Sequence, residues 1–252
     1  MEREIGVQLF ARSSRRVELT AAGAAFLPEA RASVAAADRA RAEAAAATGE
    51  LRGTLAIGLI PTVTAVDIPD LLGTFRQAHR EVSVSLRVGA SDELVAAVIA
   101  GALDVAFLGL AEDAPVTGVS SRDLAHHRLV AVVGDDHLLG QRRRLRLADL
   151  GEHPFVDFPA GSPGRAQSDR AFERAGLTRE VPYEVTSTDL ALGLVRAGLA
   201  VALLAPQMVP EQDGVRSIPV QGGPTRVEHL AWSGFNPSPA ATAFVDLVQR
   251  EQ

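Results

Sequence analysis

The chain has 252 residues, of which 47% are hydrophobic and 22% are charged, and its formal net charge is −6. It contains no cysteine and all 25 basic residues are arginine, which excludes disulfides, thiolate catalysis, cysteine-ligated metal centres and chemistry that depends on lysine. No apolar stretch is long enough to cross a bilayer, and the first residues lack the basic-then-apolar order of a signal peptide, so we expect a cytoplasmic protein without membrane contact.

The charge is distributed unevenly along the chain. Residues 1–50 hold seven arginines and seven acidic residues, so the remainder carries the whole net charge. Arg12, Arg15 and Arg16 stand within five positions of one another, and such a cationic segment suits contact with a phosphate backbone. Any contact with nucleic acid is therefore expected from this first segment.

Residues 17–20 predict a short strand that ends in a capping threonine, and residues 20–48 consist almost entirely of helix formers. Apolar residues recur along this helix at steps of three and four, and Pro28 predicts a kink or a looser first turn. This narrow apolar stripe consists of Phe26, Ala30, Val34, Ala37, Ala40, Ala44 and Ala47. Two interpretations remain open, a solvated connector and a dimerising helix; we favour the dimerising helix, because a lone helix of this length has nothing of its own to pack against.

After a predicted hinge at residues 48–53, short β-branched runs alternate with helical segments. The predicted strands are 54–60, 82–88 and 104–110, and the predicted helices are 68–79 and 91–101, the second with Ser91 as its capping serine. This β-α-β-α-β order predicts a parallel sheet covered by helices.

A second α/β unit is predicted from about residue 121. Its predicted strands are 128–133, 154–158, 181–186 and 201–205, and its predicted helices are 165–175 and 188–197. A final strand at 227–232 and a helix at 239–249 could return to the first unit. The sequence therefore predicts two similar α/β lobes.

No catalytic or metal-binding constellation emerges from the sequence. The six histidines lack metal-ligand spacing, and adjacent His126 and His127 would point to opposite faces of a strand. Residues 160–164 resemble a nucleophile elbow, but Ala160 stands where that motif needs glycine, so we interpret Ser162 as a helix cap. We expect no enzyme activity, no metal and no cofactor.

Small polar residues follow several predicted strands. In open α/β sheets, ligands bind outside the carboxyl ends of strands, often at helix N-termini whose unsatisfied N–H groups favour a carboxylate. Each such residue alone is simply a cap or a turn residue, but their convergence favours a cleft for a small anionic or polar metabolite. The predicted effector-binding residues are Pro61, Thr62, Val63, Thr64, Ser91, Leu110, Gly161, Ser162 and Ser187.

The segment GVQLFARSSRRVELTAAGAAFLPEAR closely resembles the wing and linker-helix signature of the LysR-type transcriptional regulators. The resemblance continues through GTLAIGLIPTV, GASDELVAAVIAGALDVAFLGL, FVDFPAGSPG and LGLVRAGLAVALLAP, and so over essentially the whole chain. It implies an α/β fold with a two-lobed, periplasmic-binding-protein-like (type 2) effector domain, preceded by a wing remnant and a long linker helix.

The resemblance also implies a division of the chain. Residues 1–19 correspond to a winged helix-turn-helix remnant, 20–50 to a linker and dimerisation helix, and 51–252 to the effector-binding domain. Within that domain, lobe 1 is expected at 54–120 and 225–252 and lobe 2 at 121–224, with the chain crossing between the lobes twice. Family members begin with a complete winged helix-turn-helix, whereas Met1–Ile5 here correspond only to the last turn of its recognition helix. We therefore expect that an N-terminal segment is missing, through truncation or a misplaced start codon.

The function that the resemblance implies is transcriptional regulation by a homodimer or homotetramer that senses a small effector. In the full-length form it would bind promoter DNA, with Arg12, Arg15 and Arg16 at phosphates or in the minor groove. GLIPTV is also similar to the peroxide-sensing branch, whose thiol switch the absence of cysteine excludes. The alternative is a solute-binding protein of the same fold without DNA binding.

Overall fold

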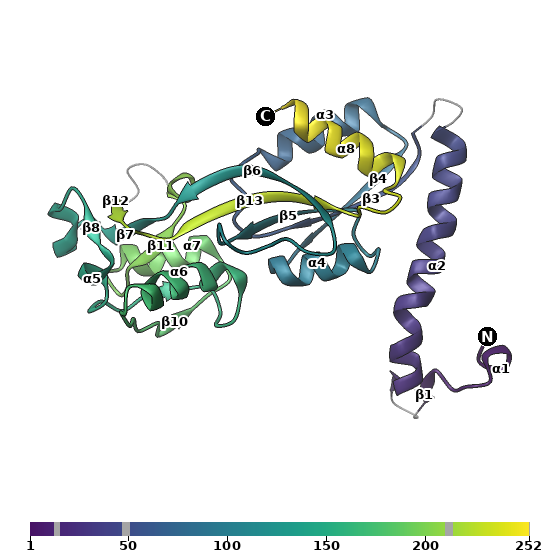
Figure 1. Cartoon of the computed structure of the whole chain (residues 1–252), viewed down its shortest axis with the longest axis horizontal. Helices are drawn as coiled ribbons and strands as arrows, with labels where there is room; N and C mark the ends of the chain where they lie inside the picture. Colours follow the sequence, from purple (N-terminus) through teal and green to yellow (C-terminus); the bar gives the residue numbers. More distant parts are fainter. Residues whose placement is uncertain (13–15, 47–50, 210–213, 252) are drawn as a thin grey trace.

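The computed structural model describes residues 1–12, 16–46, 51–209 and 214–251. Two α/β lobes lie along the long axis of the molecule, and a long helix, α2 (Ala21–Ala46), stands beside one of them and carries the N-terminal residues at its far end (Figure 1). The two-lobed α/β fold class predicted from the sequence is thereby confirmed.

The N-terminal residues form a short helix and a hairpin ahead of α2. These elements are α1 (Glu2–Ile5), β1 (Phe10–Arg12) and β2 (Val17–Leu19), and the two strands pair in antiparallel fashion. The Glu2 carboxylate accepts hydrogen bonds from the backbone N–H groups of Leu9 and Phe10 at 2.7 and 3.0 Å, which ties α1 to the hairpin.

The predicted capping role of Thr20 is confirmed, because its hydroxyl oxygen accepts from the backbone N–H of Gly23 at 3.0 Å. Helix α2 continues through Pro28. Along the predicted apolar stripe, Phe26 and Ala30 are half-buried, whereas Val34 is 64% exposed. Most of this stripe is therefore not covered by the chain itself; Ala47 lies outside the described residues.

Lobe 1 is built on a five-stranded sheet with the order β4-β3-β5-β13-β6. β3, β4 and β5 are parallel, as predicted, while β13 runs antiparallel to both β5 and β6. The elements are β3 (Gly53–Leu59), α3 (Ile68–Ala78), β4 (Val82–Val88), α4 (Ser91–Ile99), β5 (Val105–Leu110), β6 (Ser120–Arg128), β13 (Thr225–Trp232) and α8 (Pro239–Arg250).

Lobe 2 contains a four-stranded sheet with the order β11-β7-β12-β8 and a parallel pair, β9 and β10. Its strands are β7 (Val130–Gly134), β8 (Leu145–Arg146), β9 (Val156–Asp157), β10 (Tyr183–Glu184), β11 (Ala202–Leu204) and β12 (Val215–Gln221). Its helices are η1 (Leu138–Gln141), α5 (Leu147–Leu150), α6 (Pro163–Arg174), α7 (Thr188–Arg196) and η2 (Pro206–Met208).

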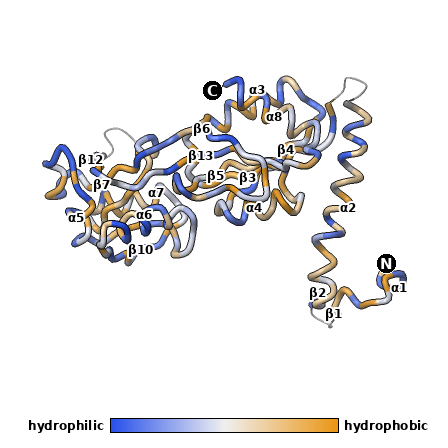
Figure 2. The backbone as a smooth tube through the Cα atoms, in the orientation of Figure 1, coloured by the Kyte–Doolittle hydropathy of each residue, from blue (hydrophilic) through white to orange (hydrophobic). Residues whose placement is uncertain are grey.

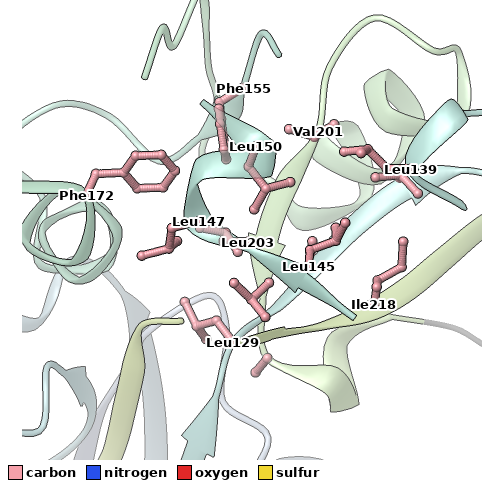
Figure 3. Packing of buried hydrophobic residues seen from close by; sticks show 14 residues of the cluster. Leu129, Leu139, Leu145, Leu147, Leu150, Phe155, Phe172, Val201, Leu203 and Ile218 are labelled. Atoms are coloured by element: carbon pink, nitrogen blue, oxygen red, sulfur yellow. The ribbon is translucent and has the colours of Figure 1, made fainter. Parts of the chain in front are cut away.

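Each lobe has its own hydrophobic core. Hydrophobic segments run through the sheets of both lobes (Figure 2). In lobe 1, the Phe244 ring meets those of Phe75 and Phe107 edge-on, with centroids 5.4 and 6.3 Å apart, a geometry that adds to area burial. In lobe 2, leucines from several elements pack with Phe155 and Phe172 (Figure 3). The lobes are therefore two packed bodies joined by two crossings of the chain.

The first crossing lies later in the chain than predicted. β6 pairs with β13 from Ser120 to Arg128, so residues 121–128 belong to the sheet of lobe 1 and the chain enters lobe 2 at about residue 129. The sequence SSRDLAHHR gives no apolar alternation because much of this strand is exposed. The strand also contains a β-bulge, in which Leu124 is an extra residue between the pairs Ala125–Glu228 and Asp123–His229.

Candidate effector-binding cavity between the lobes

A cavity of about 540 Å³ lies between the two lobes. Lobe 1 lines it with residues that follow β3 and with the start of α4, and lobe 2 lines it with residues 158–164, the start of α6 and the end of β11. The carboxyl ends of β3 and β5 meet here, which is where open α/β sheets bind ligands. The position of the predicted cleft thus coincides with a cavity.

Five of the nine predicted effector-binding residues line this cavity: Pro61, Thr62, Ser91, Gly161 and Ser162. The other four lie outside its lining: Val63, Thr64, Leu110 and Ser187. The strand ends thus predicted residues of lobe 1 and of lobe 2 that line one cavity, and their contact with an effector remains a prediction.

Ser91 plays a different local role from the one predicted. The N-cap residue of α4 is Ala90, and it is extended backbone without a side-chain cap, so the prediction of Ser91 as the capping residue is wrong. The buried Ser91 hydroxyl instead accepts from the N–H of Gly109 at 3.1 Å and lies 3.2 Å from its carbonyl oxygen. Ser91 thereby fastens α4 to the end of β5.

Ser162 and Ser187 cap helices as predicted. The Ser162 hydroxyl accepts from the N–H of Arg165 at the start of α6, and the Ser187 hydroxyl accepts from the N–H of Leu190 at the start of α7. Ser162 keeps its O–H proton available at the cavity wall. Ser187 is exposed at the start of a helix outside the lining.

Arg226, at the beginning of β13, is a charged residue of the cavity wall that was not predicted from the sequence. It is 5% exposed and lines the cavity, and its Nη2 donates to the carbonyl oxygen of Thr62 at 2.8 Å. Its Nη1 lies 4.0 Å from the sulfur of Met208 in lobe 2. Its Nε is buried and has no hydrogen-bond partner among the described residues.

The charge of Arg226 is partly balanced by Glu228, whose Oε1 lies 3.3 Å from Nη2. Burial lowers the pKa of the guanidinium, against the attraction of Glu228, but an arginine remains charged at neutral pH. A buried guanidinium with a free N–H at a cavity wall is suited to a carboxylate or phosphate ligand. Nothing in the sequence singled it out, because an arginine in a strand normally faces solvent.

Thr64 lies beneath the cavity rather than in it. Its hydroxyl donates to Oε1 of Glu228 at 2.6 Å, and its backbone N–H donates to Oε2 at 2.9 Å. The side chain of Thr64 therefore holds the loop that lines the cavity and is not itself part of the lining.

The wall of the cavity also contains groups that accept hydrogen bonds. Asp92 and Glu93, in the first turn of α4, belong to the lining, and Gln167 of α6 is buried at the lobe interface. These carboxylates offset the positive end of the α4 dipole. The cavity thus combines one buried cation with acceptors for hydroxyl or amine groups on the same ligand.

The sequence profile of the LysR substrate binding domain family matches residues 48–252. The chain belongs to the LysR family of transcriptional regulators. The HTH-type transcriptional regulator ShiR of Corynebacterium glutamicum (strain R) is 33% identical over 259 residues, which cover 98% of this chain and 85% of ShiR. A probable hydrogen peroxide-inducible genes activator of Mycobacterium avium is 36% identical over 214 residues, or 83% of this chain and 67% of the relative.

Solved structures of the LysR family share this architecture. Full-length CbnR complexed with its target DNA has a TM-score of 0.71 and 25% identity, covering 100% of this chain and 86% of CbnR. The effector-binding domain of QuiR in complex with shikimate has a TM-score of 0.68 at 22% identity, covering 79% of this chain and 97% of that domain. The QuiR comparison supports the fold alone.

Two of the three arginines predicted to touch DNA, Arg12 and Arg16, belong to the described N-terminal hairpin of this LysR-family chain. The backbone of Arg12 belongs to β1, and Arg16 is exposed with its Nη1 3.2 Å from the Glu18 carboxylate of β2. Arg15 lies outside the described residues. The contact of these arginines with DNA remains a prediction.

The adjacent histidines of β6 do point to opposite faces. His127 is buried with its Nε2 3.5 Å from Oε1 of Glu228, while His126 is exposed with its Nε2 3.4 Å from Asp123. Within the described ranges, no three His, Asp or Glu side chains are arranged to hold a metal ion. Nor does any described helix combine the length and the hydropathy needed to span a bilayer.

Proposed function

We propose that this LysR-family chain binds a small carboxylate in the cavity between its lobes and thereby changes its action on promoter DNA. The observation that carries the proposal is the Arg226 guanidinium, which is buried at the cavity wall with an Nε that no described residue satisfies. Leaving such a donor without a partner costs on the order of 1–3 kcal/mol, and a ligand carboxylate would recover that cost.

The lining sets the size and character of the ligand. A volume of about 540 Å³ has room for a single ring or a short branched skeleton and also for larger ligands. Much of the wall is apolar and comes from both lobes, including Ile60, Leu129, Phe158 and Leu204. The carboxylates of Asp92 and Glu93 favour a ligand that also carries hydroxyl groups. We propose Pro61, Thr62, Ser91, Gly161, Ser162 and Arg226 as its contacts.

Ligand binding acts by bringing the lobes together. A ligand that touches both walls has more contacts when the lobes are close, and only such a difference in affinity can shift the equilibrium between arrangements. Because the chain crosses between the lobes through the β6–β7 and β12–β13 connections, the shift would appear as a change in lobe orientation.

The remaining parts of the proposal concern DNA and assembly. We propose residues 1–19 as part of the DNA-contacting unit, with Arg12, Arg15 and Arg16 at phosphates, and residues 20–50 as the linker that forms the dimer. Residues 51–252 then form the sensing domain. We also propose a cytoplasmic protein without enzyme activity, since the relatives in this family are named as regulators.

The proposal is tested with benzoate and shikimate, the carboxylates present in the solved BenM and QuiR effector-binding domains. We expect at least one to raise the melting temperature of the chain, and its neutral methyl ester to have no effect. Arg226→Met should abolish the shift, whereas Arg216→Met, at an exposed arginine of β12, should retain it. Equal binding by Arg226→Met and the wild type would contradict the assignment.

A further inference from the structure

Glu228 of β13 lies behind the cavity wall and is 1% exposed. Both oxygens of its carboxylate face the loop that follows β3. Oε2 accepts from the N–H of Thr64 at 2.9 Å and from the N–H of Ala65 at 3.0 Å, and Oε1 accepts from the Thr64 hydroxyl at 2.6 Å. One buried carboxylate thus accepts hydrogen bonds from three donors on two consecutive residues of the loop.

The same carboxylate also orients Arg226. Its Oε1 lies 3.3 Å from Nη2, and that Nη2 donates to the carbonyl oxygen of Thr62 at 2.8 Å. The loop is therefore held at Thr62 by the arginine and at Thr64 by the glutamate, while the arginine is held by the glutamate. Pro61 and Thr62 line the cavity, whereas Glu228 does not.

The charged and titratable groups around Glu228 come from both strands that lead to lobe 2. Arg226 lies on β13, and His127 of β6 places its Nε2 3.5 Å from Oε1 of Glu228 and 3.3 Å from the Thr64 hydroxyl oxygen. Burial lowers the pKa of His127 below its usual value of 6.5, which keeps the ring neutral at pH 7. The glutamate and the arginine then balance each other in a nearly dry environment.

We propose that Glu228 is the positioning residue of this cavity: it fixes the loop at residues 61–65 and the guanidinium of Arg226 in one geometry, and it connects both to the strands that cross between the lobes. Its effect on ligand affinity rests on the proposed function, since it assumes that the cavity takes an anion. Its effect on the loop does not depend on any ligand.

Asp104 is a half-buried, hydrogen-bonded carboxylate in the same lobe that can serve for comparison. Asp104, just before β5, accepts from the N–H of Ala56 at 2.8 Å and from the Ser238 hydroxyl at 3.1 Å, and it lies outside the cavity lining. Asp104→Asn is therefore the control for Glu228→Gln, because each change replaces a hydrogen-bonded carboxylate in lobe 1 by its amide.

The first arm of the experiment measures hydrogen exchange at single amides of the full chain by NMR. We expect Glu228→Gln to speed exchange at Thr64 and Ala65 by about tenfold or more while the amides of β3 keep their rates, because an amide group cannot accept all three loop donors. Asp104→Asn should leave Thr64 and Ala65 unchanged. Thr64→Val removes the 2.6 Å hydrogen bond to Glu228 and the 3.3 Å contact with His127, but it keeps the two backbone hydrogen bonds to the carboxylate. It should therefore give a smaller increase, and it replaces Glu228→Gln if that variant does not fold.

The second arm measures benzoate and shikimate affinity for the same variants. We expect Glu228→Gln to weaken binding by about tenfold, roughly what one lost charge-assisted hydrogen bond costs, and Asp104→Asn to leave it unchanged. Wild-type rates at Thr64 and Ala65 in both Glu228→Gln and Thr64→Val would overturn the proposal, as would faster exchange with unaltered affinity. If the wild type binds neither acid, the proposed function fails with these ligands, and the exchange arm still decides whether Glu228 positions the loop.

Discussion

Gln167 of α6 donates a hydrogen bond from its side-chain amide to the carbonyl oxygen of Gly109, at the end of β5, over 3.4 Å. The two residues belong to different lobes, and the bond lies at the edge of the cavity that both of them line. The same oxygen lies 3.2 Å from the Ser91 hydroxyl. Any separation of the lobes at this point must therefore break a buried hydrogen bond.

Replacing Gln167 by alanine should loosen this arrangement. We expect Gln167→Ala to lower the free energy of unfolding by about 1 kcal/mol and to increase the radius of gyration of the unliganded chain. Small-angle X-ray scattering and urea denaturation measure the two effects. Gln141→Ala, at an exposed position of lobe 2, is the control and should change neither. An unaltered radius in Gln167→Ala would mean that other contacts set the distance between the lobes.

A methyl group at Gly109 should displace Arg226. A Cβ at this position would lie 2.7 Å from Nε and 2.8 Å from Nη2 of Arg226, so the guanidinium must move. We expect Gly109→Ala to destabilise the chain by about 1–3 kcal/mol and to abolish the melting-temperature shift with carboxylates. Gly193→Ala, in helix α7 with open space around the added methyl, should fold with equal or higher stability and bind normally.

The buried histidines predict loss of stability in mild acid. Burial lowers the pKa values of His127 and His229 from 6.5 in the folded chain. As the pH falls, these histidines therefore bind protons at a higher pH in the unfolded chain than in the folded chain. The free energy of unfolding should therefore decrease from about pH 7 to about pH 5, and His229→Asn should flatten this slope. Denaturation in urea across that range tests it.

Removing the partner of His229, Asp123, should have the opposite effect to His229→Asn on the pH dependence of stability. Asp123 lies 2.9 Å from Nδ1 of His229 and raises its pKa, in part offsetting the burial. Asp123→Asn should therefore lower the pKa of His229 further and steepen the loss of stability toward acid. A slope that is the same in Asp123→Asn and the wild type would show that this pair does not contribute.

The exposed stripe of α2 predicts a dimer. Val34 is 64% exposed, and burying it against a second copy would recover part of its hydrophobic free energy. We expect light scattering to find a dimer or larger assembly at tens of micromolar, and Val34→Asp to shift it toward monomer. Ala36→Asp, an exposed position off the stripe, controls for the added charge. A monomeric wild type would rule out assembly through this helix.

The hairpin arginines predict weak DNA binding that depends on salt and not on sequence. A few phosphate contacts give an affinity that falls as salt rises, with a slope close to the number of phosphates neutralised. Fluorescence anisotropy with two unrelated duplexes should give equal affinities for this chain, and Arg16→Gln should reduce the slope by about one. Tight binding to one duplex alone would show that the chain reads bases.

The positions of strand β4 and of the start of helix α4 were predictable because their signals are local. Residues 82–88 match β4, and the predicted start of α4 at Ser91 matches the structure, since alternation and turn residues mark these segments directly. The Glu228 cluster could not be predicted in this way. Thr64 and Glu228 are 164 residues apart in the chain, and no periodicity encodes their meeting. From one sequence alone, a charged residue in a predicted strand is expected to face solvent. The burial of Arg226 and Glu228 was therefore not predicted.

The bulge in β6 affects the angle between lobe 1 and lobe 2. An extra residue in one strand of an antiparallel pair bends that strand and increases its twist, and Figure 1 shows β6 and β13 curving together toward lobe 2. Deleting Leu124 would leave the partners Ala125–Glu228 and Asp123–His229 opposite each other, yet straighten the ribbon that carries the second lobe. The orientation of the two cavity walls relative to each other thus depends on one extra residue in β6. A sequence alignment that places a gap at Leu124 would not show this dependence.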